Sequence, residues 1–126
     1  MACMLLEQFC TTEPGMKLKD LALAIEARMH PGSGNGDSRI VRVYAGITMS
    51  DLIAHASSDT LIVTSLNNAQ LARVAELMDV PGICLVDGTA PGPELLAAAQ
   101  KVGTTIVVSP AGLEATHRAL HQVLGA

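Results

Sequence analysis

Aromatic side chains are nearly missing from this chain, which has one Tyr, one Phe and no Trp among 126 residues. A hydrophobic core must therefore be built from aliphatic side chains, and platforms on which nucleic-acid bases stack are disfavoured. Basic residues are also scarce, at 8 Lys and Arg against 12 Asp and Glu, for a formal net charge of −4. This balance disfavours nucleic acids and anionic membrane surfaces as partners.

Long apolar runs and paired cysteines are missing as well. No run approaches the ~18 residues that a membrane-spanning helix needs. Cys3, Cys10 and Cys84 are scattered and form no C-x-x-C pair, so we interpret them as reduced thiols of a cytoplasmic protein. With 49% hydrophobic residues, a chain of this length is sufficient for one domain with its own core.

The first 15 residues differ from the rest of the chain. They carry two of the three cysteines and end in a Thr-Thr-Glu-Pro-Gly breaker, after which Met16 begins an amphipathic pattern. They lack the positively charged start of a typical secretory signal. We interpret residues 1–15 as an N-terminal extension and residues 16–126 as a single α/β domain. The alternative for residues 1–15 is a short helix that packs on a partner.

Amphipathic segments alternate with β-branched runs over most of this domain. Apolar residues at helical spacing predict helices over residues 17–28, 48–56, 67–78, 93–102 and 113–124. Short apolar runs predict strands over residues 39–44, 61–64, 83–86 and 105–108. These strands show no polar alternation, so both faces of their sheet are expected to be covered. The pattern predicts a three-layer α/β fold, with a mostly parallel sheet of about four to five strands flanked by helices.

Three loops follow predicted strands and lead into helices, at residues 65–68, 87–89 and 109–112. These loops lie at the carboxyl ends of the parallel strands, which is the edge of the sheet where α/β proteins bind ligands. The N-termini of the helices that follow favour an anion there. Hydroxyl, amide and carboxylate groups in these loops suit a polar small ligand, for example a nucleotide. The candidate ligand-binding residues are Ser65, Asn67, Asn68, Asp87, Gly88, Thr89 and Ser109.

Two interpretations of this rim stay open. In the first, Gly88 lets a ligand approach the backbone and Asp87 accepts hydrogen bonds from ligand hydroxyls, as from a ribose. Asp87→Ala should then weaken binding and leave the melting temperature of the free protein nearly unchanged. In the second, Asn67, Thr89 and Ser109 only cap helices and turns.

Motifs for catalysis and metal binding are weak. The chain has no G-x-S-x-G elbow and no P-loop, and Cys84 lies in an apolar run where a thiol is usually inert. The glycine-rich segment 31–37 follows a helix and enters a strand, the reverse of a phosphate-binding loop. His117 and His121 share a helix, but further ligands are missing, so we predict no metal site and interpret His117 as a packed core residue.

Several segments, in their order along the chain, resemble the DRTGG domain family. These segments are MKLKDLALAI at 16–25, Gly46 followed by Ser50-Asp51, the run 61–64, the helix 68–78, VPGICLVDG at 80–88, PELL at 93–96, and TIVVSP at 105–110 before a helix with Thr116. The family includes regulatory modules found beside CBS domains and in phosphotransacetylases. Its fold is related to that of the non-catalytic N-terminal domain of HPr kinase/phosphorylase. The resemblance implies a homodimer, because the family's modules tend to pair.

Two loops depart from the family pattern. Val86-Asp87-Gly88 stands where the family often has Thr-Gly-Gly, and Ser65-Leu66-Asn67 where longer members have Gly-Asp-Arg. This chain lacks the arginine of those longer members, and the carboxylate of Asp87 would repel a phosphate. An anion-binding site of the family is therefore not expected to be kept here.

These observations favour a non-catalytic regulatory or adaptor module, cytoplasmic, homodimeric and without a cofactor, which binds a nucleotide-like small ligand or a protein partner. One alternative is a small metabolic enzyme that acts on a phosphorylated metabolite at the strand-end rim. Another is a purely structural interaction subunit. Ligand-dependent melting would separate the first hypothesis from the third, and turnover of phosphate esters would test the second.

Overall fold

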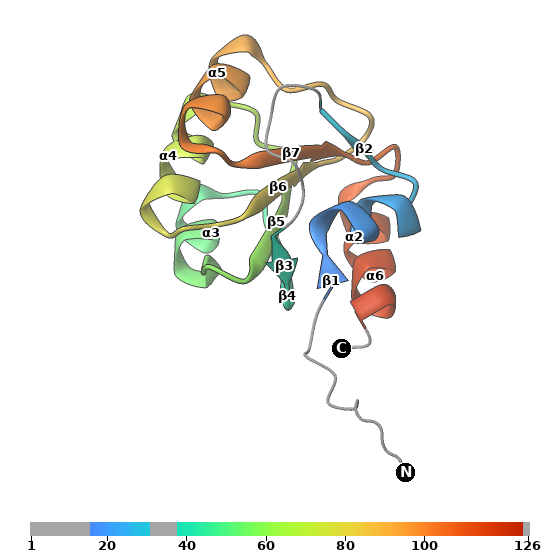
Figure 1. The fold of residues 1–126 in the computed structure, drawn as a ribbon. Coiled ribbons are helices and arrows are strands. Elements are labelled where there is room, and N and C mark those ends of the chain that lie inside the picture. Colours follow the sequence, from blue (N-terminus) through green and yellow to red (C-terminus); the bar gives the residue numbers. More distant parts are fainter. Residues whose placement is uncertain (1–15, 31–37, 125–126) are drawn as a thin grey trace.

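The computed structural model describes residues 16–30 and 38–124 (Figure 1). The expectations for the extension 1–15 and the glycine-rich segment 31–37 lie outside these residues. The elements are β1 (Met16–Lys17), α2 (Leu18–Ala24), β2 (Arg28–Met29), β3 (Arg39–Ile40), β4 (Arg42–Ala45), α3 (Met49–His55), β5 (Thr60–Thr64), α4 (Ala69–Leu77), β6 (Gly82–Leu85), α5 (Pro93–Val102), β7 (Thr105–Val108) and α6 (Leu113–Leu124). In the described part of the chain, no helix is long and apolar enough to cross a membrane.

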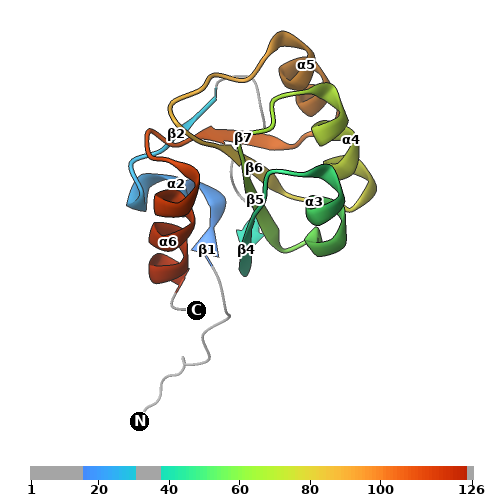
Figure 2. The ribbon, with the colours of Figure 1, turned by 180° about the vertical axis from the view of Figure 1, so that it is seen from behind.

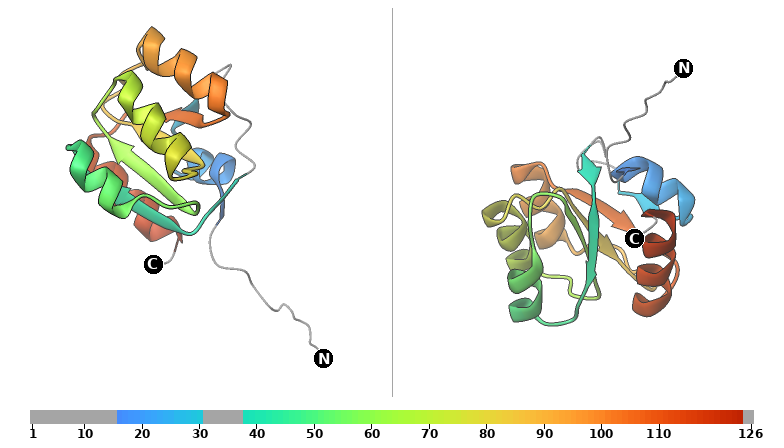
Figure 3. Two further views of the ribbon diagram at one scale, coloured as in Figure 1. Left: turned by 90° about the vertical axis from the view of Figure 1, so that its left-hand side faces the viewer. Right: turned by 90° about the horizontal axis from the view of Figure 1, so that it is seen from below.

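The central sheet has the strand order β2-β7-β6-β5-β4, in which β7, β6, β5 and β4 run parallel and β2 pairs antiparallel with β7. The short strands β1 and β3 form a separate antiparallel pair. Helices α3, α4 and α5 cover one face of the sheet and α2 and α6 cover the other, as Figures 2 and 3 show from behind and from below. The predicted three-layer, mostly parallel α/β fold is therefore confirmed.

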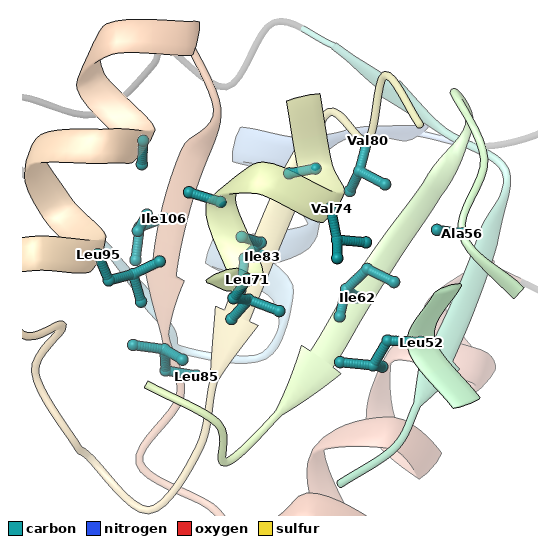
Figure 4. Close-up of a cluster of buried hydrophobic side chains, with 13 residues drawn as sticks. Leu52, Ala56, Ile62, Leu71, Val74, Val80, Ile83, Leu85, Leu95 and Ile106 are labelled. Atoms are coloured by element: carbon teal, nitrogen blue, oxygen red, sulfur yellow. The ribbon is translucent and has the colours of Figure 1, made fainter. Parts of the chain in front are cut away.

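Two hydrophobic cores lie on the two faces of the sheet because neighbouring strand residues point to opposite sides. Under α3, α4 and α5, the buried side chains labelled in Figure 4 are Leu52, Ala56, Ile62, Leu71, Val74, Val80, Ile83, Leu85, Leu95 and Ile106. Under α2 and α6, the buried set includes Leu18, Leu21, Leu61, Val63, Cys84, Val86, Val107 and Leu120. Both cores are aliphatic, as the composition requires.

Helix α2 is shorter than predicted. The expected helix over 17–28 ends at Ala24, and the chain then reverses at Glu26, whose φ is +60°. The N–H of Ala27 donates to Ala22 O and the N–H of Glu26 donates to Leu23 O, which together form a Schellman motif. Because of this reversal, Arg28 and Met29 leave the helix and form strand β2 beside β7.

Two further boundaries differ from the sequence expectation. The predicted strand over 39–44 is divided, because residues 39–40 pair with β1 whereas residues 42–45 pair with β5. Helix α4 is capped by Asn68, whose Oδ1 accepts from the N–H of Leu71 at 3.2 Å, and not by Asn67. Asn67 is thereby free for a different role, described below.

Cys84 is the one described cysteine, and it is buried in β6 between neighbouring strands. Burial raises the pKa of its thiol from 9.0 to about 12, against a smaller lowering by the backbone hydrogen bond with Ser109. Burial and the raised pKa both support the prediction of an inert thiol, because only the thiolate is a strong nucleophile.

The raised pKa of Cys84 predicts a loss of stability in alkali. The unfolded thiol ionises from about pH 9 while the folded thiol stays neutral to about pH 12. Protons therefore leave only the unfolded state in this window, and the free energy of unfolding falls by about 1.4 kcal/mol per pH unit. Urea titrations of wild type and Cys84→Ala should diverge over this range, with the variant losing less stability. Parallel pH profiles for the two proteins would contradict the assignment.

Candidate functional site

A cavity of about 420 Å³ opens beside the carboxyl end of β7, and we call it the main cleft. Its lining residues are Arg28, Met29, His30, Gly88, Ala90 and Val108. A smaller cavity of about 230 Å³, the side cleft, shares Arg28, Gly88 and Val108 with it and adds Glu26 and Pro110. The volume of the main cleft lies in the range of small-molecule sites, which is roughly 300–1,000 Å³.

Strand β2 forms one wall of both clefts. Its antiparallel register places Arg28 opposite Val108 and Met29 opposite Val107. The N–H of His30 donates to Ile106 O at 2.8 Å and extends this pairing by one residue. An arginine from the N-terminal part of the chain is therefore brought to the strand-end edge of the sheet. Sequence reasoning missed it because Arg28 was assigned to a helix.

The opposite wall is the loop that follows β6. Asp87 and Gly88 both have positive φ, at +60° and +67°, and the N–H of Thr89 donates to Val86 O. Two central residues with positive φ are typical of a type I′ turn, for which Asp-Gly is a preferred sequence. A Cβ at position 88 would meet no atom within 4 Å, so the backbone of Gly88 is open to the clefts.

All three N–H groups of this turn are already used inside the protein. Asp87 N–H donates to Ala111 O and Gly88 N–H donates to Ser109 O, both at 2.8 Å, and Thr89 N–H donates to Val86 O at 3.1 Å. Each main-chain N–H is a single donor. The turn therefore cannot cradle a phosphate in the way a glycine-rich anion loop does.

Asn67 connects the loop after β5 with the loop after β6. Its Nδ2 donates to Ala90 O at 2.9 Å, and its Oδ1 accepts from the N–H of Gly92 at 2.7 Å. Gly92 precedes Pro93, the first residue of α5, so this single amide also holds the start of that helix. Asn67 acts on the main cleft through Ala90, which lines it.

Asn67→Ala should therefore increase local opening of the loop beside the main cleft, with only a small loss in the free energy of unfolding. Two hydrogen bonds at an exposed position contribute about 1–2 kcal/mol together to the free energy of unfolding. Amide hydrogen exchange should become faster at Gly92, whose N–H loses its acceptor, and remain unchanged in β5 and β7. Asn68→Ala is the matched control, because it removes only the α4 cap. Equal exchange at Gly92 in wild type and Asn67→Ala would show that the amide does not hold the loop.

The other predicted rim residues are distributed over different roles. Ser65 and Thr89 have exposed side chains that line neither cleft. Ser109 is buried, where its hydroxyl bonds Thr116 Oγ1 at 2.8 Å and accepts from the N–H of Ala111. Asn68 caps α4. Of the seven predicted ligand-binding residues, Gly88 alone lines the main or the side cleft.

Asp87 faces the start of α6 and not the clefts. A Cβ at position 112 would lie 3.4 Å from its Oδ1, and Gly112 directly precedes the first residue of α6. The positive end of the α6 helix dipole stabilises a carboxylate at this position. The left-handed backbone also makes Asp87→Ala a strained substitution, because Asp tolerates this region better than Ala does. We therefore expect Asp87→Ala to lower the melting temperature of the free protein, and Asp87→Asn is the variant that tests the charge alone.

A third cavity, of about 400 Å³, lies on the exposed side of α6 and is lined by Glu114, His117, Arg118, His121 and Gln122. The rings of His117 and His121 lie 5.2 Å apart, and His117 is partly exposed, so its interpretation as a packed core residue is wrong. Within residues 16–30 and 38–124, no group of three or more His, Cys, Asp or Glu side chains is arranged to hold a metal ion.

Comparison with known proteins finds a similar fold among solved structures. No family model and no curated protein matches the chain. Among solved structures, it is similar to the CBS and DRTGG domains of the regulatory region of a Clostridium perfringens pyrophosphatase, complexed with the activator diadenosine tetraphosphate. The TM-score is 0.67 at 14% sequence identity, and the match covers 84% of this chain and 46% of that one. The chain spans less than half the length of this neighbour and has a DRTGG-like fold.

Proposed function

We propose that this protein is a regulatory or adaptor module that binds a small, nucleotide-like ligand without transforming it. The observation that carries the proposal is the main cleft, which lies at the strand-end edge where α/β sheets bind ligands. The fold adds support, because its structural neighbour is a regulatory region that was crystallised with a nucleotide activator.

The chemistry of the main cleft favours binding over catalysis. Its described walls offer one guanidinium, one imidazole, backbone groups and apolar side chains, but no hydroxyl or thiol side chain. The thiol of Cys84 is buried in the sheet and has a raised pKa. A small enzyme acting on a phosphorylated metabolite is the alternative, because His30 and Arg28 line the same cleft.

A thermal melting screen tests the proposal. Purified protein is heated with adenosine, AMP, ADP, ATP, diadenosine tetraphosphate and the corresponding guanine nucleotides, each in excess. A ligand at about 100 times its Kd stabilises the folded state by about 2.7 kcal/mol, which raises the melting temperature by several degrees. The same samples are analysed for hydrolysis products. A shift without turnover supports the regulatory module, turnover supports the enzyme, and no shift with any nucleotide contradicts a nucleotide-like ligand.

We further propose that the protein acts as a homodimer with a twofold contact. Ile47 (58% exposed) and Ile53 (47% exposed) are exposed apolar side chains that lie before and within α3. Exposed apolar patches mark interaction surfaces. Light scattering at micromolar concentration should give twice the chain mass of 13.1 kDa. A value equal to one chain would contradict the dimer.

A further inference from the structure

The clefts need a donor for any anionic ligand, and the backbone of the neighbouring turn cannot supply it. The amides of Asp87, Gly88 and Thr89 all donate to backbone oxygens within the fold. In addition, the N–H of Gly92 donates to Asn67 and that of Ala111 donates to Ser109. These five N–H groups of the loops after β6 and β7 therefore already have acceptors inside the protein.

Arg28 is the strong donor that the described walls provide. It lies on the wall common to the main and side clefts, and its side chain is exposed. Arg42 pairs with Asp59 and Arg118 with Glu114, whereas no ion pair joins Arg28 to a carboxylate of the described residues. A guanidinium binds phosphate and carboxylate through two parallel N–H groups.

The rest of the two clefts is largely apolar. Met29, Ala90 and Val108 line the main cleft, and Val108 and Pro110 line the side cleft. A ligand that satisfies both parts of this surface has an anionic group at one end and a body with apolar surface at the other.

We infer that Arg28 binds the anionic group of the ligand, whose apolar body lies against Met29 and Val108, and that the ligand class is a nucleoside phosphate. The inference rests on the proposed function and deepens it, because it names the residue that binds the anionic group of the ligand. It also assigns a role to a residue far in sequence from the three loops of the predicted rim. Glu26 lines the side cleft and repels the same anionic group.

Calorimetric titration with adenosine, ADP and inorganic pyrophosphate tests this assignment. Arg28→Gln should weaken binding of ADP and pyrophosphate about tenfold or more, because hydrogen bonds to charged groups are lost. Adenosine affinity should change by less than about twofold, since its binding uses the apolar wall alone. Arg73→Gln is the matched control, because Arg73 is also exposed and lines neither cleft. It should leave all three affinities unchanged.

Two further variants distinguish the loss of an anion contact from a damaged fold. Arg28→Lys keeps the charge and should recover part of the ADP affinity. Glu26→Gln removes the repelling carboxylate and should tighten ADP binding, a gain that a damaged fold cannot produce. Equal ADP affinity in wild type and Arg28→Gln would overturn the inference while leaving the proposed function intact.

The remaining outcomes separate the two claims. If no nucleotide binds but pyrophosphate binds in an Arg28-dependent way, the nucleotide proposal fails and the anion site stands. If wild type binds adenosine but neither ADP nor pyrophosphate, Arg28 does not read an anion and the inference is wrong. If none of the three probes binds, the inference is wrong, and the melting screen with the other nucleotides decides the proposed function.

Discussion

Leu85→Ala should lower the free energy of unfolding by about 3–4 kcal/mol, because it removes a fully buried side chain and leaves a cavity. Leu85 is 1% exposed at the end of β6 and belongs to the core under α3, α4 and α5 (Figure 4). It is followed directly by the loop that forms a wall of the main cleft. Urea unfolding followed by circular dichroism measures the change.

Leu77→Ala is the matched control for this prediction. Leu77 is the last residue of α4 and is 82% exposed, and alanine favours a helix at least as well as leucine does. The same chemical change should therefore shift stability by less than about 0.5 kcal/mol. Equal losses in the two variants would mean that the core does not lie where the structure places it.

Gly82→Val should cost about 3 kcal/mol, although valine is the better strand residue by intrinsic preference. A Cβ at position 82 would lie 2.5 Å from Cδ2 of Leu18 and 3.3 Å from Cδ1 of Leu61. Both leucines are fully buried, so neither can move aside without disturbing its neighbours. Gly82 is thus the place where α2 packs directly against the sheet.

The double variant Leu18→Ala/Gly82→Val tests this close approach. Removing the Leu18 side chain makes room for valine, so the double variant should lose clearly less stability than the two single variants together. Because α2 leads through Glu26 into β2, Gly82→Val should also weaken ligand binding in the clefts. Greater stability of Gly82→Val alone, or simple additivity of the two changes, would contradict the packing described here.

The parallel part of the sheet could be predicted because its strands are short β-branched runs between amphipathic helices. Thr48 and Gly103 are also ordinary signals for a helix start and a helix end, since Thr48 Oγ1 accepts from the N–H of Asp51 and Gly103 has a φ of +80°. Strand β2 could not be predicted in the same way. It has two residues, and the reversal before it uses Glu26 where glycine is the usual signal.

The candidate site was predicted only in part. The strand-end edge of the sheet and Gly88 follow from the alternation of strands and helices. Arg28 does not, because its position depends on antiparallel pairing with Val108, a contact between residues 80 positions apart. Ser109 and Asn67 have side chains that suit a ligand equally well, and only their internal partners show that they support the loops.

The central claim is that a ligand binds in the main cleft and not along the loop rim. Backbone amide chemical shifts measured by NMR during titration with ADP test it directly. We expect the resonances of Arg28, Met29, Gly88 and Ala90 to move together along one saturable curve, while those of Ser65 and Asn68 stay in place. Shifts confined to residues 65–68, or no shift at Arg28 and Gly88 when ADP is saturating, would contradict it.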